Sequence, residues 1–178
     1  MTSDKPPVAD ACVKTKPPAA TILDVEAFAA VLPAGARLIG VDVGTKTLGL
    51  ALSDLSRTIA SGLETIRRTK FKADAERLVA LVREHKVAGL VIGLPISLDG
   101  SSGPRAQASQ SFARLIGPLA DVPILMWDER LTTAQAERLL IEADASRKRR
   151  AEVIDKMAAT LILQGALDRM RALRPSGQ

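Results

Sequence analysis

Cysteine, histidine and aromatic residues are almost absent from this chain. Of its 178 residues, Cys12 is the only cysteine and His85 the only histidine. An intramolecular disulfide is therefore impossible, which fits the reducing cytoplasm, and zinc sites built from these two residue types are disfavoured. Aromatic residues make up 2% of the chain and none is tyrosine, so a platform that stacks the bases of single strands is not expected.

Long apolar runs are also missing. Hydrophobic residues make up 47% of the chain, yet no run approaches the roughly 20 residues that cross a membrane. The polar N-terminus lacks the apolar stretch of a signal peptide. We therefore expect a cytoplasmic protein with no membrane partner, and the length suits one domain with a substantial core.

Positive charge is concentrated in the body of the chain. Residues 1–36 hold three lysines against four carboxylates, a net charge of −1, so the rest carries +6 from 22 basic and 16 acidic side chains. A basic body suits a polyanion such as nucleic acid, although many enzymes without such a partner are equally basic. Because aromatics are scarce, recognition would depend on backbone and shape.

Residues 1–36 are expected to form a flexible N-terminal extension. Residues 1–20 hold two proline pairs among small polar residues, a composition typical of mobile termini. The segment Thr21–Leu32 has a weak helical pattern that could pack on the domain or lie in a linker. The domain itself is expected over residues 37–174, followed by a tail at 175–178.

A meander of three antiparallel strands is predicted next. Leu38–Val43 and Leu48–Ser53 are short β runs joined by a turn, and a third strand is expected within Thr58–Ile66. Alternation puts Gly40 and Asp42 on one face of the first strand. Small residues recur on the second strand, so this face would leave room for a ligand.

Helical spacing then alternates with buried apolar runs. The expected elements are a helix over about 75–85, a strand at Val87–Leu94, a helix from Pro104 to about Ile116, a strand at Val122–Trp127, a helix from Thr132 to about Ala143, a mobile basic loop at Asp144–Arg150 and a helix over Glu152–Arg171. This order predicts an α/β fold with one mixed five-stranded sheet flanked by helices, in which strands 4 and 5 run parallel to strand 1.

Three acidic sites fall at the ends or flanks of these elements. Asp42 lies next to the end of the first strand, the pair Asp128-Glu129 follows the fifth, and Asp155 lies near the start of the last helix. A carboxylate beside an apolar element is costly unless a cation or partner offsets it. Two divalent cations bridged by carboxylates can hydrolyse a phosphodiester. Oxygen ligands without histidine or cysteine favour Mg²⁺ or Mn²⁺, so two such ions are predicted.

Each carboxylate also has an ordinary structural explanation. Asp42 could accept hydrogen bonds from the amides of the following turn, one acid of the pair could form a local ion pair with Arg130, and Asp155 could be a first-turn aspartate favoured by the helix dipole. If the strand continues, Asp128 and Glu129 point to opposite faces. We expect Glu129 to be the metal ligand and Asp128 to act outside it.

Helical geometry places Asp155 relative to an expected apolar stripe. That stripe consists of Ile154, Met157, Ala158, Leu161, Ile162 and Gly165. At about 100° per residue, Asp155 falls at its margin, on the side of Ile162. A carboxylate there could reach the sheet edge without being trapped in the core.

Basic and small residues near these acids are candidates for substrate binding. The loop 97–103 could hold phosphate through backbone amides at the next helix N-terminus, with Arg105 assisting, although such loops are often only connections. Arg130 could contact the scissile phosphate. The run of Arg147, Lys148, Arg149 and Arg150 could deliver nucleic acid to the cations, although a solvated charged loop is the commoner role.

Four stretches of the chain resemble the YqgF family, the RuvX-type proteins described as Holliday junction resolvases and as pre-16S rRNA nucleases. They are Gly40–Asp54, Gly93–Pro95 with Asp99-Gly100 and Gly103–Gln107, Asp128–Ala136, and Asp155–Ala159 with Leu163-Gln164. The Asp-Glu-Arg-Leu-Thr-Thr string within the third is the most specific. Lys46 stands where the family usually has arginine, and Ser97 where it usually has asparagine; both are substrate-binding candidates.

The resemblance implies a ribonuclease H-like fold and a metal-dependent endonuclease that acts on structured nucleic acid. It favours trimming of the 5′ side of pre-16S rRNA over cleavage of branched DNA at a four-way junction. Two other classes stay open: an actin-like ATP-binding module, suggested by Asp42-Val43-Gly44-Thr45, and a non-catalytic RNA-binding factor in ribosome assembly. The chain could be a monomer or a homodimer, and symmetric junction cleavage would need the dimer.

Overall fold

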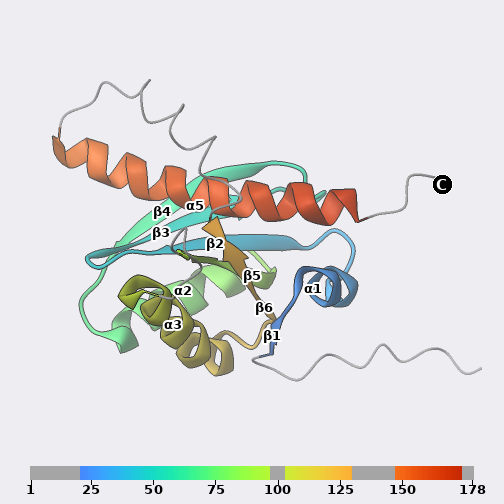
Figure 1. Ribbon diagram of the computed structural model, residues 1–178, viewed down its shortest axis with the longest axis horizontal. Coiled ribbons are helices and arrows are strands. Elements are labelled where there is room, and N and C mark those ends of the chain that lie inside the picture. The colour runs from blue at the N-terminus through green and yellow to red at the C-terminus, as the bar shows by residue number, and fades with distance from the viewer. Residues whose placement is uncertain (1–20, 97–102, 130–146, 174–178) are drawn as a thin grey trace, which may run out of the picture.

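One mixed sheet lies between two layers of helices (Figure 1). The computed structural model describes residues 21–96, 103–129 and 147–173, with side chains in the last range from residue 155. The strands are β1 (Ile22–Leu23), β2 (Arg37–Val43), β3 (Thr47–Ser53), β4 (Ala60–Arg67), β5 (Val87–Leu94) and β6 (Ile124–Asp128). The helices are α1 (Val25–Val31), α2 (Phe71–Glu84), α3 (Pro104–Ala120) and α5 (Arg147–Ala172).

The sheet has the predicted strand directions and one additional strand. Its order is β1-β6-β5-β2-β3-β4. Strands β2, β3 and β4 pair antiparallel, while β5 is parallel to β2 and β6 is parallel to β5. The additional strand β1 pairs with β6 through two residues only, which is too short for a recognisable alternation. Because β2, β5 and β6 are parallel, their carboxyl ends lie at the same edge of the sheet.

The segment before β2 packs on the domain. Asp24 caps α1 by accepting a hydrogen bond from the amide of Ala27 at 2.8 Å. Phe28 on α1 is fully buried, and a Cβ on Gly89 of β5 would lie 2.6 Å from the Phe28 ring. Of the two alternatives for this segment, packing is therefore the one observed. Residues 1–20 lie outside the described residues.

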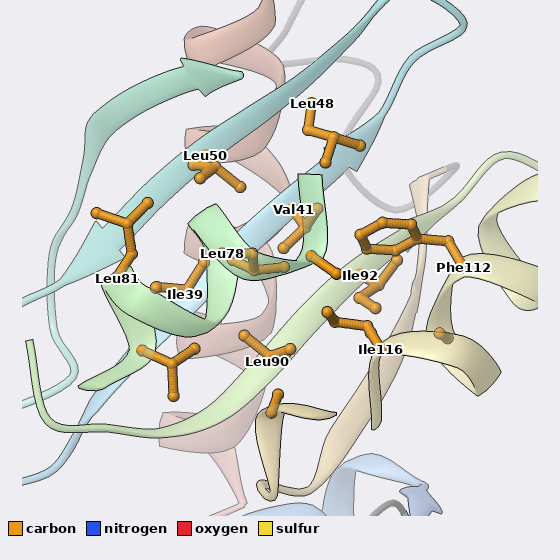
Figure 2. Close-up of a cluster of buried hydrophobic side chains, with 14 of the residues drawn as sticks. Ile39, Val41, Leu48, Leu50, Leu78, Leu81, Leu90, Ile92, Phe112 and Ile116 are labelled. Carbon is orange, nitrogen blue, oxygen red and sulfur yellow. The ribbon is translucent and has the colours of Figure 1, made fainter. Parts of the chain in front are cut away.

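Separate hydrophobic clusters fill the two sides of the sheet. Helices α2 and α3 cover one face, where the branched side chains of β2, β3 and β5 meet them (Figure 2). Helices α1 and α5 cover the other (Figure 1). Gly40 and Asp42 belong to this second face, because Ile39, Val41 and Val43 point into the first cluster.

The small-residue face of β2 and β3 is covered by a helix at Gly40 and Gly49, where space for a ligand was expected, and a pocket is present at the strand end beside Asp42. A Cβ on Gly40 would lie 2.7 Å from Leu163 Cβ and 2.8 Å from the Ala159 carbonyl oxygen, both on α5. A Cβ on Gly49 would collide with the carbonyl group of Asp155. Glycine is required at both positions because the backbone of α5 lies directly on the sheet.

Helix α5 differs from the expectation in its start and in its buried face. It begins at Arg147, so residues 147–150 are helical and not part of a loop. Its stripe against the sheet contains Ala159, Ile162, Leu163, Ala166, Leu167 and Met170. Asp155 lies one turn before Ala159 and continues this stripe. Apolar residues occur on several sides of α5, so periodicity alone could not determine which side is buried. The buried side is determined by Gly40 and Gly49 of the sheet, which the backbone of α5 contacts.

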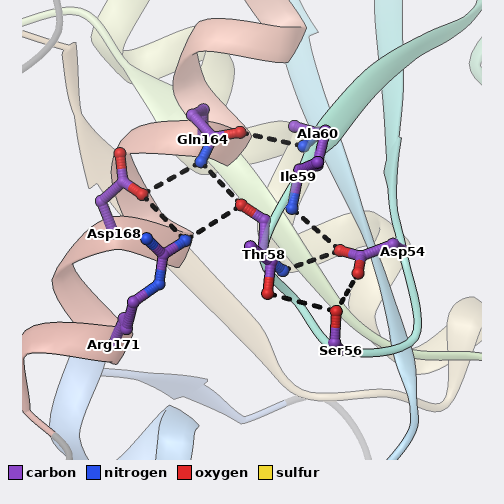
Figure 3. Close-up of polar contacts among 8 residues, drawn as sticks. All are labelled: Asp54, Ser56, Thr58, Ile59, Ala60, Gln164, Asp168 and Arg171. Atoms are coloured by element: carbon purple, nitrogen blue, oxygen red, sulfur yellow. Dashed lines mark hydrogen bonds and ion pairs between the residues drawn. The ribbon is translucent and has the colours of Figure 1, made fainter.

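Hydrogen bonds from the β3–β4 loop fix the rotation of α5 (Figure 3). Gln164 donates to the Thr58 carbonyl at 3.0 Å and accepts from the Ala60 amide at 2.9 Å. Asp54 organises the loop by accepting from the Thr58 amide at 2.7 Å and from the next amide at 2.9 Å. These backbone donors lower the pKa of Asp54. The loop and Gln164 thereby hold the side of α5 that carries Asp155 toward the sheet.

Two other expectations about helices need comment. Helix α3 continues to Ala120 although its end was expected near residue 116. Pro118 lies in the last turn, where it removes one backbone hydrogen bond without ending the helix, and Asp121 ends it in the left-handed conformation. The helix expected over 132–143 lies outside the described residues. None of the helices that the structure describes is long and apolar enough to cross a membrane.

Candidate active site

Two of the predicted acids project from the same edge of the sheet toward α5. Asp42 is the penultimate residue of β2, paired with Gly49, and Glu129 directly follows β6. A Cβ on Gly93 of β5 would lie 2.5 Å from Glu129 Oε1, so the missing side chain makes room for this carboxylate. Strand alternation places Asp128 on the opposite face. The preference for Glu129 over Asp128 is consistent with this arrangement.

Electrostatic interactions connect the three acidic sites through Asp42. Burial and the negative charge of Asp155 raise the pKa of Asp42, and Arg105 opposes this shift. Burial, and then the charges of Asp42 and Asp128, raise the pKa of Glu129 to about 7, again against Arg105. Asp42 therefore interacts electrostatically with both Asp155 and Glu129, and Arg105 is the positive charge that acts on Asp42 and Glu129.

Asp42 and Asp155 lie in the wall of a pocket of about 760 Å³ beside the β2–β3 turn. Its other lining residues are Gly44, Thr45, Lys46, Thr47, Thr65, Arg67, Arg68 and Arg105. Glu129 lies outside this wall, next to Gly93. The pocket thus combines two carboxylates with four basic side chains, a combination suited to a phosphodiester and its metal ions.

The structure describes only some of the predicted substrate-binding residues. Lys46 and Arg105 line the pocket. Ser97 and Arg130 lie outside the described residues, and of the run 147–150 only the helical backbone is described.

Sequence reasoning missed Thr65, Arg67 and Arg68, which line the pocket from the end of β4 and the residue after it. The predicted order of the strands could have indicated these residues. The last strand of an antiparallel meander ends beside the first turn, so its final residues, here paired as Arg67 with Thr47, had to lie near Lys46.

Two of the ordinary explanations for the acids do not fit the geometry. Asp155 lies in the third turn of α5, too far along for the N-terminal dipole, whose effect is confined to the first turn. The pKa of Asp42 is raised mainly by its burial, and the charge that lowers it comes from Arg105 and not from the turn. The pairing of Asp128 or Glu129 with Arg130 involves a residue outside those described.

The donor set is compatible with a hard divalent cation. Asp42, Asp155 and Glu129 offer carboxylate oxygens, and their repulsion and burial raise two of their pKa values, a cost that a cation would offset. Within the described ranges, no three Asp, Glu, His or Cys side chains form a complete metal cluster. Magnesium does not require one, because it retains waters and takes substrate oxygens beside one or two carboxylates.

Comparison with known proteins assigns the chain to a family. A family model described as RuvX, Holliday junction resolvase, matches residues 36–169. The chain belongs to the RuvX family. The expected YqgF resemblance is thereby confirmed, and it decides against an actin-like module, which would close two lobes around ATP.

Curated relatives of this RuvX chain are similar over most of their length. One from Bradyrhizobium sp. (strain BTAi1) is 57% identical over 159 residues, covering 89% of this chain and 99% of the relative. Another from Paramagnetospirillum magneticum (strain AMB-1) is 61% identical over 132 residues, covering 74% of this chain and 85% of the relative. Both carry the provisional name pre-16S rRNA nuclease.

A solved structure shares the fold of the RuvX chain. The structure of T. thermophilus RuvC in complex with a Holliday junction substrate matches with a TM-score of 0.52 and 13% identity, covering 76% of this chain and 96% of that one. At this identity the likeness shows the fold alone. The ribonuclease H-like fold expected from the sequence is confirmed.

Gly49→Ala should destabilise this RuvX chain and separate its two pocket acids. The new methyl group would collide with the Asp155 carbonyl, so α5 must shift, at a cost of about 1–3 kcal/mol in the free energy of unfolding. Urea denaturation would measure it. Gly103→Ala is the matched control, because a Cβ there meets nothing within 4 Å. Equal stability of the two variants would contradict direct packing of α5 on β3.

Proposed function

We propose that this chain is a divalent-cation-dependent endonuclease that hydrolyses phosphodiester bonds in structured nucleic acid, acting in the cytoplasm on the 5′ side of pre-16S rRNA. The observation that carries the proposal is the electrostatic convergence of Asp155 and Glu129 on Asp42, at the wall of a pocket with four basic side chains. The family and the names of the curated relatives support the same activity.

The residues divide the chemical work as follows. Asp42, Asp155 and Glu129 would hold Mg²⁺ or Mn²⁺, as two ions, and Asp128 would act behind Glu129. Bound divalent cations lower the pKa of the attacking water and neutralise the phosphate. Lys46 and Arg105 line the pocket beside Asp42 and would hold the non-bridging phosphate oxygens, which orients the phosphodiester and favours its developing charge.

A purely RNA-binding role fits the site less well. Asp42 and Asp155 in the wall of the basic pocket repel phosphate, and burial raises the pKa values of Asp42 and Glu129. In a protein that only bound RNA, neutral residues at these positions would bind phosphate more tightly. Titratable groups perturbed in this way are characteristic of reaction centres, which supports catalysis.

Four-way DNA junctions are the second candidate substrate. The matching family model is described as a Holliday junction resolvase, whereas the curated relatives carry an rRNA nuclease name. Symmetric junction cleavage requires two active sites related by a two-fold axis. The choice between substrates therefore also concerns whether the chain acts as a monomer or a homodimer.

Direct competition between the two substrates tests the proposal. Purified wild-type protein should cut an RNA that carries the 5′ flank of 16S rRNA in Mg²⁺ and should leave it intact in EDTA. An equimolar labelled four-way junction in the same reaction should be cut more slowly. Exclusive junction cleavage would establish the second candidate, and absence of metal-dependent cleavage of both substrates would refute the nuclease proposal.

A further inference from the structure

Both ends of the turn that carries Lys46 are hydrogen-bonded to the residue that directly follows β4. The Arg68 guanidinium donates from Nη1 to the Gly44 carbonyl at 2.7 Å, and the Arg68 amide donates to the Lys46 carbonyl at 2.9 Å. The second bond extends the β3–β4 ladder past its last paired residues, Thr47 and Arg67. Arg68 therefore spans the three-residue connection between β2 and β3.

A buried carboxylate in the first turn of α2 forms an ion pair with Arg68. Asp74 on α2 is 3% exposed, and its Oδ2 lies 3.9 Å from Arg68 Nε. Its Oδ1 accepts a hydrogen bond from the Thr69 amide at 3.2 Å. A carboxylate in this position requires such partners, and they fix it relative to the end of β4. The Asp74 carboxylate and the Gly44 carbonyl thus contact different nitrogens of one guanidinium, Nε and Nη1.

Gly44 shows how closely the turn is folded. A Cβ at this position would lie 2.8 Å from the Thr47 carbonyl oxygen, so the chain doubles back with no room for a side chain. Lys46, in contrast, is exposed and lines the pocket beside Asp42. A lysine has a flexible stem and a point charge, so the place of its ammonium group depends on how its backbone is held.

We propose that Arg68, held by Asp74, is a positioning residue that fixes the Gly44–Lys46 turn so that Lys46 meets a substrate phosphate. This inference rests on the proposed function, because it assigns Lys46 to phosphate binding. Arg67 provides the contrast. It is the neighbouring basic residue, it is exposed and lines the same pocket. Its backbone pairs with Thr47 of β3, whereas the Arg68 side chain reaches the turn itself. Arg68 thus acts through Lys46, and Arg67 acts on the phosphates directly.

A structural role for Asp74 must be separated from this positioning role. Helix α2 has Lys70 as its N-cap without a side-chain hydrogen bond, and the contact between Asp74 and the Thr69 amide stabilises that helix end. Loss of Asp74 would therefore lower stability in either case. Arg68 is the better probe, because its guanidinium contacts the turn itself.

A double-mutant cycle between Arg68 and Lys46 tests the inference. Binding is measured by fluorescence anisotropy on a labelled RNA duplex with single-stranded flanks, in Ca²⁺ in place of Mg²⁺, over a series of salt concentrations. Lys46→Ala and Arg68→Ala should each weaken binding about tenfold, the loss of one charge-assisted contact, and each should reduce the salt slope by about one. The double variant should bind no more weakly than Lys46→Ala alone.

Two further variants distinguish the loss of a positive charge from the loss of the contact that holds the turn. Arg67→Ala removes the same charge from the same pocket, and its effect should multiply with that of Lys46→Ala to about a hundredfold. Arg68→Lys retains the charge but cannot span both partners, so it should bind as weakly as Arg68→Ala, with an unchanged thermal midpoint as the check on folding. Wild-type binding by Arg68→Lys would overturn the inference.

The outcomes distinguish failure of the inference from failure of the proposed function. If Lys46→Ala weakens binding but combines multiplicatively with Arg68→Ala, Arg68 contacts the phosphate on its own and the positioning role is refuted. If Lys46→Ala leaves both affinity and salt slope unchanged, the pocket does not bind the substrate backbone, and the proposed site fails with it.

Discussion

Asp42→Asn and Asp155→Asn should each lower phosphodiester cleavage by about 10²–10⁴-fold, the range for a group that acts directly at the reacting centre. Nucleic-acid binding should be retained or become tighter, because each change removes a negative charge from a pocket that receives phosphate. Single-turnover cleavage and equilibrium binding on the same RNA would measure the two effects separately.

The stability of the metal-free Asp42→Asn variant distinguishes a catalytic acid from a structural one. Burial and the charge of Asp155 raise the pKa of Asp42, so ionised Asp42 opposes folding, and a neutral amide of the same shape removes that penalty. The free energy of unfolding near pH 8 should therefore not fall. A structural aspartate with good donors would show the reverse, a loss of stability together with the loss of cleavage.

Asp168→Asn is the matched control on the same helix as Asp155. Asp168 is about half exposed and pairs with Arg171 at 3.3 Å and with Gln164 at 3.0 Å, away from the pocket lining. Its replacement should leave cleavage unchanged. Equal loss of cleavage in Asp168→Asn and Asp155→Asn would show that any charge change on α5 disturbs the enzyme, which would contradict a specific role for Asp155.

Much of the sheet could be predicted because its signals are local. The alternation in β2 and β3, the tight Gly44 turn and the apolar runs of β5 and β6 each depend on neighbouring residues, and together they determine strand directions. The same alternation indicates that only one of Asp128 and Glu129 faces the site, but it does not by itself select Glu129. Asp42 was found because a carboxylate at the end of a buried strand is unusual enough to require explanation.

The remainder depended on contacts between distant parts of the chain. The buried side of α5 is selected by Gly40 and Gly49, which lie more than a hundred residues earlier, and not by its own hydrophobic period. Helix α1 packs because Gly89 leaves space for Phe28, which neither segment reveals alone. Arg68 has no motif, and its role depends on a turn and a helix that meet only after folding.

Stability of the metal-free protein should fall as pH rises from about 4.5 to about 7. Burial, with the charges of Asp42 and Asp128, raises the pKa of Glu129 from 4.5 to about 7. Within this interval the folded chain retains a proton that the unfolded chain has released, so rising pH favours unfolding. Glu129 is partly open to solvent screening, and we expect a loss of about 1–2 kcal/mol.

Glu129→Gln should reduce this decline, leaving the part that Asp42 contributes, and should make the metal-free protein more stable than wild type at pH 8. The matched control is Glu64→Gln. Hydrogen bonds from Arg77 lower the pKa of Glu64, so its contribution is present above its ordinary pKa and is lost only at lower pH. Urea denaturation in EDTA at several pH values would measure the difference, and a wild-type stability that is flat or rises over this interval would contradict it.

Divalent cation should reverse the pH trend, because a metal ion and a proton compete for the same carboxylate. Above pH 7 the ionised Glu129 can accept Mn²⁺, so the cation should raise the thermal midpoint strongly at pH 8 and weakly at pH 5.5. Glu129→Gln should reduce the stabilisation at pH 8, whereas Glu64→Gln should not. If Mn²⁺ stabilised wild type and Glu129→Gln equally at pH 8, Glu129 would not be a ligand, and its raised pKa would reflect only its burial beside Asp42.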